Sequence, residues 1–128
     1  MARLRDKVAL VTGAARGTRA VTARRFVAEG ARVILADILD DLGEAVSKDV
    51  GEDAHHVHLD VTHEDDWRDA ISRTHAAFGR LDVLVNNAAV LEVEALEDTT
   101  LDAFVRAVMV DQVGSFLGIR AATAVMKD

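Results

Sequence analysis

Short apolar runs alternate along this chain with longer segments in which apolar residues recur every three or four positions. Each run has the length and the aliphatic content of a buried strand. These runs predict strands at Val8–Thr12, Arg32–Asp37, His55–Asp60 and Asp82–Asn87. The helical period in the remaining segments predicts helices at Thr18–Glu29, at Asp40–Val50, from about Thr62 onward, and over Leu101–Met126.

This alternation of strands and helices predicts an α/β fold with a doubly wound, Rossmann-type parallel sheet. Right-handed crossovers give the spatial strand order 3-2-1-4. The first two helices should cover one face of the sheet and the last two the other. We expect a single domain over residues 1–128. The sequence ends where a fifth strand should begin, so the sheet is expected to be truncated there, with the fourth strand as an open edge.

The third helix has the most complete internal pattern. Thr62, followed by Asp65 three residues later, predicts a capping box at its start. Its inner stripe is expected at Trp67, Ala70, Ile71, Thr74 and Phe78. Phe104 and Phe116 in the last helical segment also lie at core spacing, so we expect them to pack inside, as Trp67 does.

Three histidines occur together in the third predicted strand. In a strand, His56 and His58 share one face and His55 points to the other. No neighbouring carboxylate completes a tetrahedral ligand set with them, so no metal site is expected.

Charge and composition exclude several classes of partner. The formal net charge of −7 would repel phosphate, which argues against binding to nucleic acid or an anionic membrane. The sequence lacks an apolar run of about 18 residues, the length needed to span a membrane. It also has no cysteine, which fits the reducing cytoplasm. It has no tyrosine, so no phenol of this chain can donate a proton.

The stretch TGAARG directly follows the first predicted strand and opens the first predicted helix. Small residues there expose backbone N–H groups at a helix N-terminus, which suit a pyrophosphate. Asp37 ends the second strand, 24 residues after Gly13. A carboxylate there accepts hydrogen bonds from both ribose hydroxyls of an adenosine and repels a 2′-phosphate, so the pattern favours NAD. The alternative for Asp37 is a solvated strand end.

Two other nucleotide sites use similar loops. A Walker loop is excluded, because no lysine follows Gly17. A methyltransferase that binds S-adenosylmethionine also combines a glycine loop with an acid at the end of the second strand, and it stays open on these residues alone.

The motifs TGAARG, LDVT and LVNNA, in this order and spacing, resemble the signatures of the short-chain dehydrogenase/reductase family. The resemblance covers the whole chain. The segments ADILD, HVHLDVT and SFLGIRAA are most similar to bacterial 3-alpha/20-beta-hydroxysteroid dehydrogenases. The resemblance implies an NAD(H)-dependent oxidoreductase of secondary alcohols or ketones. It also implies a homo-oligomer in which the last helix builds a subunit interface.

The resemblance also implies which residues bind the cofactor. They are Gly13, Arg16, Gly17, Thr18, Asp37, Ile38, Asp60, Val61, Asn87, Ala88 and Ala89. Three positions depart from the family pattern. Arg19 replaces a third glycine, Ala89 replaces the glycine of NNAG, and Asp111 stands where the family has its active-site asparagine. Asp111 is therefore the one candidate catalytic residue, and Arg19 is expected to crowd the cofactor.

In full-length relatives, the catalytic serine and the Tyr-x-x-x-Lys pair lie beyond the position of residue 128. The resemblance therefore implies that the 128-residue chain is inactive by itself. One hypothesis is the cofactor-binding part of a short-chain oxidoreductase. The alternative is a non-catalytic nucleotide-binding or dimerising remnant. The sequence does not name a substrate.

Overall fold

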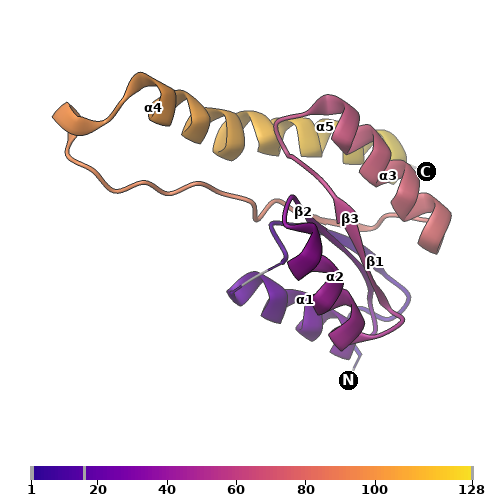
Figure 1. Ribbon diagram of the computed structural model, residues 1–128. Helices are drawn as coiled ribbons and strands as arrows, with labels where there is room; N and C mark the ends of the chain where they lie inside the picture. Colours follow the sequence, from indigo (N-terminus) through magenta and orange to yellow (C-terminus); the bar gives the residue numbers. More distant parts are fainter. Residues whose placement is uncertain (1, 16, 128) are drawn as a thin grey trace.

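The computed structural model describes residues 2–15 and 17–127, apart from the side chains of Thr18 and Arg19. Strands and helices alternate through the first part of the chain, and two consecutive helices end it (Figure 1). The elements are β1 Val8–Thr12, α1 Thr18–Ala28, β2 Arg32–Asp37, α2 Asp40–Val50, β3 Ala54–His58, α3 Glu64–Phe78, β4 Val83–Val85, a 3₁₀ turn Leu96–Asp98, α4 Leu101–Val108, a π-helical turn Met109–Val113 and α5 Gly114–Met126.

The four strands form one parallel sheet in the order β3-β2-β1-β4, as predicted. Strands β1 and β2 are buried along almost their whole length because helices cover both faces of the sheet. On one face, Val11, Val33 and Leu35 pack with Ala23 of α1 and Val46 of α2. This confirms the predicted fold class and places the first two helices on one face.

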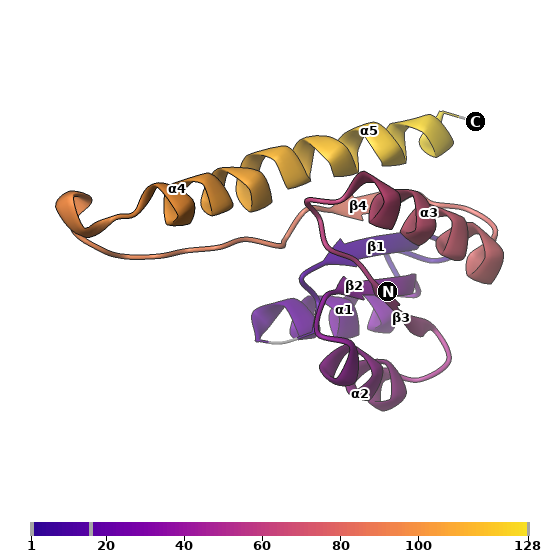
Figure 2. The ribbon, with the colours of Figure 1, turned by 45° about the horizontal axis from the view of Figure 1, so that its top comes forward.

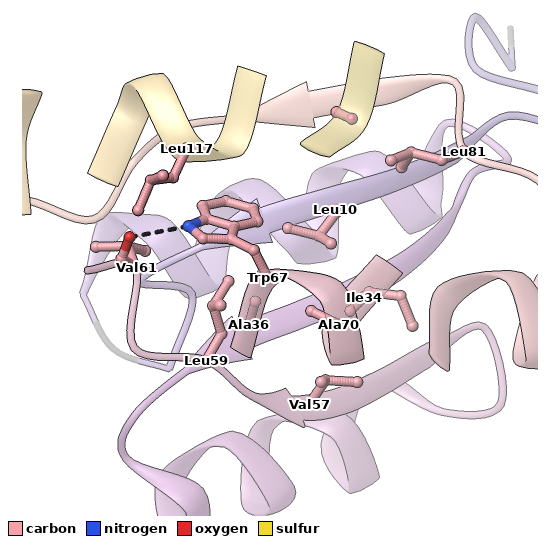
Figure 3. Close-up of a cluster of buried hydrophobic side chains, with 11 residues drawn as sticks. Leu10, Ile34, Ala36, Val57, Leu59, Val61, Trp67, Ala70, Leu81 and Leu117 are labelled. Carbon is pink, nitrogen blue, oxygen red and sulfur yellow. Dashed lines mark hydrogen bonds between the residues drawn. The ribbon is translucent and has the colours of Figure 1, made fainter. Parts of the chain in front are cut away.

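The opposite face of the sheet packs against α3 and α5 (Figure 2). Leu10 and Ile34 contribute the sheet side of this core, Trp67 and Ala70 come from α3, and Leu117 comes from α5 (Figure 3). Trp67 is 1% exposed, so its predicted role in packing is confirmed. Ala70 and Thr74 are buried as well, and Ile71 and Phe78 pack partly buried against this core.

The prediction for the other two aromatic residues is wrong. Phe104 is 61% exposed and Phe116 is 57% exposed. Helix α4 extends beyond the sheet, so its apolar stripe has no layer to pack against (Figure 2). In α5, the sheet side is occupied by Gly114, Leu117, Gly118 and Ala122, and Phe116 lies on the other side of the helix.

The outer strands are shorter or shifted relative to the prediction. Strand β3 ends at His58, two residues before the predicted end, and on the side away from β2 the backbone N–H of Asp60 donates to the Asp66 carboxylate. Strand β4 is a sheet edge that pairs only with β1. Beyond its end, the N–H of Asn87 donates to the Thr12 hydroxyl.

The predicted capping box of α3 is wrong. The helix begins at Glu64, His63 is its N-cap residue, and no side chain caps it. The hydroxyl of Thr62 donates to Asp60 instead, at 2.7 Å. Three acidic residues in the first turn still complement the helix dipole.

Candidate functional site

The glycine-rich loop has the backbone conformation expected for an anion-binding turn. Gly13 and Gly17 have φ values of 62° and 65°, in the left-handed region that favours glycine. Gly17 is the N-cap residue of α1, whose first turn carries no acidic residue. The first N–H groups of a helix have no partner within the helix, so they can receive an anion here. Arg16 and the side chains of Thr18 and Arg19 lie outside the described residues.

Asp37 fixes the geometry of this loop. Asp37 is 8% exposed, and its two carboxylate oxygens accept hydrogen bonds from N–H groups in two different turns. Oδ2 accepts the N–H of Ala15 in the glycine-rich loop at 3.1 Å, and Oδ1 accepts the N–H of Leu39 at 2.9 Å. Each oxygen keeps a further lone pair, so the same carboxylate can also accept ribose hydroxyls. Asp37 is therefore not the solvated strand end that was its alternative interpretation.

The end of β3 is held to the end of β2. The N–H of Leu59 donates to the carbonyl of Asp37 at 3.1 Å. The carbonyl of Val61 accepts the indole N–H of Trp67 at 2.9 Å (Figure 3). These bonds place Asp60 and Val61 beside Asp37, because the carboxyl ends of parallel strands meet at one edge of the sheet.

Asp60 stays ionised in this position. Burial acts to raise the pKa of its carboxyl, but hydrogen bonds from the hydroxyl and N–H of Thr62 act in the other direction. With the nearby His63, these bonds outweigh burial and lower the pKa of Asp60 below its ordinary value. An ionised carboxylate is an acceptor only, which suits an amine donor on a ligand.

The segment after β4 is anchored by Thr12, which the sequence analysis treated only as the end of a strand. The Thr12 hydroxyl accepts the N–H groups of Asn87 and Ala88, both at 2.9 Å, and donates to the carbonyl of Val85 at 3.4 Å. Thr12 is 1% exposed. Its hydroxyl thus uses its one donor and both acceptors to hold the NNAA turn next to the glycine-rich loop.

These elements surround a cleft of about 180 Å³ at the carboxyl edge of the sheet. It is lined by Gly13, Asp37, Ile38, Leu39, Leu59, Asp60, Val61, Ala88, Ala89, Val90, Arg106 and Val110. Most of the predicted cofactor residues thus come together, whereas Gly17 and Asn87 do not line the cleft. Typical ligand pockets measure about 300–1,000 Å³. The enclosed part therefore fits a base with part of its sugar, and the remainder of a dinucleotide would lie along the open edge.

Asp111 lies apart from this cleft. It is in the π-helical turn between α4 and α5, and it lines a separate hollow with Phe104 and Leu91. Its Oδ1 accepts the N–H of Val90 at 2.8 Å. The carboxylate thus ties the chain after the NNAA turn to the helix, and its catalytic role stays a prediction.

The site also contains six residues that were not predicted to belong to it: Thr12, Leu39, Leu59, Val90, Arg106 and Val110. Arg106 and Val110 are four residues apart, a spacing that puts them on one face of a helix. That spacing was visible in the sequence, but nothing in the sequence says that this face meets the cleft.

The histidine pair contacts a carboxylate that the sequence analysis did not consider. His56 Nε2 and His58 Nδ1 each lie 2.9 Å from Asp40 Oδ1, whereas His55 stacks on Phe78 on the other face. This confirms the predicted faces of β3. Among the described residues, no group of three or more His, Cys, Asp or Glu side chains is arranged to hold a metal ion.

Comparison with known proteins places this geometry in a family. The family model described as short chain dehydrogenase matches residues 7–128. The chain belongs to the short-chain dehydrogenase family. The predicted resemblance to bacterial 3-alpha/20-beta-hydroxysteroid dehydrogenases is confirmed too. A 3-alpha-(or 20-beta)-hydroxysteroid dehydrogenase of Mycobacterium tuberculosis (strain ATCC 25618 / H37Rv) is 48% identical over 126 residues, 98% of this chain and 48% of that protein.

Other short-chain dehydrogenases are similar over the same region. The trans-4-hydroxycyclohexanecarboxylate dehydrogenase of Sinomonas cyclohexanicum is 42% identical, with 98% of this chain and 52% of that protein covered. The crystal structure of a 3-ketoacyl-(acyl-carrier-protein) reductase from Brucella melitensis, complexed with NADH, superposes with a TM-score of 0.87 at 33% identity. The match covers 91% of this chain and 49% of that one. The chain spans about half the length of the curated relatives it matches.

One further finding concerns membranes. In the part of the chain that the structure describes, no helix is both long enough and apolar enough to cross a membrane.

Proposed function

We propose that this chain is the NAD-binding part of a short-chain oxidoreductase that interconverts secondary alcohols and ketones, with a hydroxysteroid as one substrate class to test. The observation that carries the proposal is the Asp37 carboxylate, 8% exposed and facing a cleft beside the glycine-rich loop. The similarity to a reductase that was crystallised with NADH supports a nicotinamide nucleotide as the cofactor.

The described residues fit the adenosine half of NAD. The Asp37 carboxylate suits the two ribose hydroxyls, and the ionised Asp60 suits the exocyclic amine of adenine. A pyrophosphate would lie at the N-terminus of α1, beyond Gly17. When bound, the nicotinamide ring would supply hydride transfer to or from the carbinol carbon. Selection of NAD over NADP follows from Asp37, because a buried carboxylate repels a dianionic 2′-phosphate.

Proton transfer to the alcohol or ketone oxygen needs a group that these residues do not supply. The 128-residue sequence contains no tyrosine, and the Asp111 carboxyl group, which accepts the N–H of Val90, does not line the cleft. We therefore propose that the chain alone binds cofactor without turnover, in the cytoplasm. Enzyme-dependent NADH consumption by the purified chain with any ketone would contradict this part of the proposal.

We further propose that the chain self-associates through α4 and α5. Leu101, Phe104, Phe116 and Ile119 are each at least 57% exposed on these helices. Large exposed apolar side chains gathered on two consecutive helices are typical of protein interaction sites. A second copy of the chain is the occupant that the family resemblance favours.

The cofactor assignment is tested by calorimetric titration of NAD and NADP into the parent chain and Asp37→Asn. We expect the parent to bind NAD at least tenfold more tightly than NADP. Losing a hydrogen bond to a charged group costs about 1.5–3 kcal/mol, which is about 10- to 150-fold in the dissociation constant of NAD.

The ratio of the two affinities separates cofactor recognition from structural damage, because Asp37 also braces two turns. Loosening of those turns would weaken NAD and NADP together. Loss of the ribose contact should lower the preference for NAD specifically. Asp41→Asn, an exposed charge change on α2, is the matched control and should leave both affinities unchanged. A parent chain that prefers NADP would contradict the assignment.

A further inference from the structure

Arg106 is the one basic residue among those that line the cleft, and it comes from α4, whereas Asp37 comes from the end of β2. Arg106 lies in the last turn of α4, four residues before Val110, which lines the same cleft. Residues at this spacing are neighbours on one helix face. Helix α4 extends past the carboxyl ends of the strands (Figure 2), and Arg106 and Val110 line the cleft at those ends.

Among the described residues, the Arg106 side chain makes no hydrogen bond, ion pair or ring contact. Most other described arginines are ion-paired, as Arg68 is with Asp65 and Arg120 is with Glu64. Arg106 stays unpaired although Asp37 and Asp60 line the same cleft. Both carboxylates already accept backbone N–H groups.

A role in stabilising the end of α4 does not account for this arginine. A cation stabilises the last turn of a helix by interacting with free carbonyl groups. Here the backbone stays helical through Met109, with φ −63° and ψ −45°, and continues through Met109–Val113 into α5. No helix end is therefore present for Arg106 to neutralise.

The surroundings of Arg106 favour a flat ring over a phosphate. Leu59, Val61, Ala88 and Val110 give the cleft apolar walls, and its other polar groups are carboxylates that repel phosphate. The N-terminus of α1, which suits a pyrophosphate, begins at Gly17, outside the cleft lining. A guanidinium is planar, weakly hydrated and attracted to the face of an aromatic ring.

We infer that Arg106 closes the cleft over the adenine base, with its guanidinium stacked on the ring face, and so contributes to recognition of the base. This inference rests on the proposed function. It assigns to α4 a direct part in cofactor binding, in addition to the association surface that the same helix presents.

The test is a titration of three ligands into the parent chain, Arg106→Gln, Arg106→Lys and Arg5→Gln. Adenosine carries the base without phosphate, nicotinamide mononucleotide carries phosphate without adenine, and NAD carries both. Arg5→Gln is the matched control, because Arg5 is an exposed arginine near the N-terminus that does not line the cleft. Thermal unfolding without ligand checks that the variants fold alike.

We expect Arg106→Gln to weaken adenosine and NAD by a similar factor, about 2- to 30-fold for a cation on an aromatic face, and to leave nicotinamide mononucleotide unchanged. Arg106→Lys should recover only part of this loss, because an ammonium keeps the charge and loses the plane. Arg5→Gln should change none of the three affinities.

Equal loss for nicotinamide mononucleotide and adenosine would overturn the inference, because Arg106 would then not distinguish a ligand with adenine from one without it. Full recovery in Arg106→Lys would overturn the stacked guanidinium, because charge alone would then suffice. Unchanged adenosine binding in Arg106→Gln would also overturn it, while leaving the proposed function in place. If the parent chain binds neither adenosine nor NAD, the proposed function fails first, and this inference fails with it.

Discussion

Replacing Gly43 by alanine should destabilise the fold, although alanine is the better helix former. Gly43 is buried in α2 against the imidazole ring of His56 on β3. A Cβ atom at this position would lie 2.5 Å from Cε1 and 2.7 Å from Cγ of that ring. Both distances are well inside van der Waals contact, so either the ring or the helix must move.

Gly43→Ala has two opposing effects on the free energy of unfolding. Alanine in place of glycine inside a helix gains about 0.5–1 kcal/mol. Overpacking a well-packed site costs about 1–3 kcal/mol. The ring cannot escape cheaply, because its side chain is 3% exposed and it contacts the carbonyl of Leu35 at 3.0 Å and Asp40 at 2.9 Å. A neutral imidazole can donate to only one of these two acceptors, and that hydrogen bond contributes about 0.5–1.5 kcal/mol. Set against the helix gain, the overpacking cost leaves a net destabilisation of about 1 kcal/mol, within a range of roughly 0–2.5 kcal/mol.

Urea unfolding, followed by the fluorescence of the buried Trp67, measures this free energy. The decisive comparison is the same Gly43→Ala change made in a His56→Ala background. There the obstructing ring is absent, so the alanine should stabilise the protein by its helix propensity, and the sign of the effect reverses. Glu44→Ala, at the exposed neighbouring position, is the control and should change the free energy of unfolding by less than about 0.5 kcal/mol. Equal or greater stability of Gly43→Ala in the parent background would refute this reasoning.

Three further outcomes are expected. The hydrogen bond to Asp40 raises the pKa of His58 above its ordinary 6.5. The stabilisation from this bond is therefore complete below about pH 6.5 and is lost as the pH rises through the folded-state pKa of His58. Asp40→Asn should flatten the pH dependence of the free energy of unfolding, measured in urea between pH 6 and 8. Phe104→Asp should shift the chain toward monomer in light scattering, because it places a charge in the exposed apolar surface of α4. A parent chain that is monomeric at high concentration would contradict self-association. Arg19→Gly should tighten NAD binding in a titration, and the double change with Ala89→Gly should tighten it more, because the family resemblance implies glycine at both positions. Weaker binding would make Arg19 a ligand.

The sequence by itself determined the layers and the strand order of this protein. Continuous apolar runs such as VALVT and RVILAD mark strands buried on both faces, and the order 3-2-1-4 predicted for them with right-handed crossovers is the one observed. It also determined that Gly13 and Asp37 would meet at the carboxyl edge of the sheet. The end of each parallel strand is fixed once the strand is assigned, and both residues lie at such ends.

Only the tertiary structure decided which side chains complete the site and which surfaces stay open. Hydrophobic periodicity describes one segment at a time. It therefore predicted buried positions for Phe104 and Phe116, although no other layer of the fold packs against these side chains. The sequence also did not show which of two possible partners a polar group would choose. The Thr62 hydroxyl, for example, binds the Asp60 carboxylate and not the N-terminus of α3. Arg106 and Asp37 lie far apart in the sequence and line one cleft because α4 extends over the strand ends. Such contacts depend on how whole elements pack, and local patterns do not encode that packing.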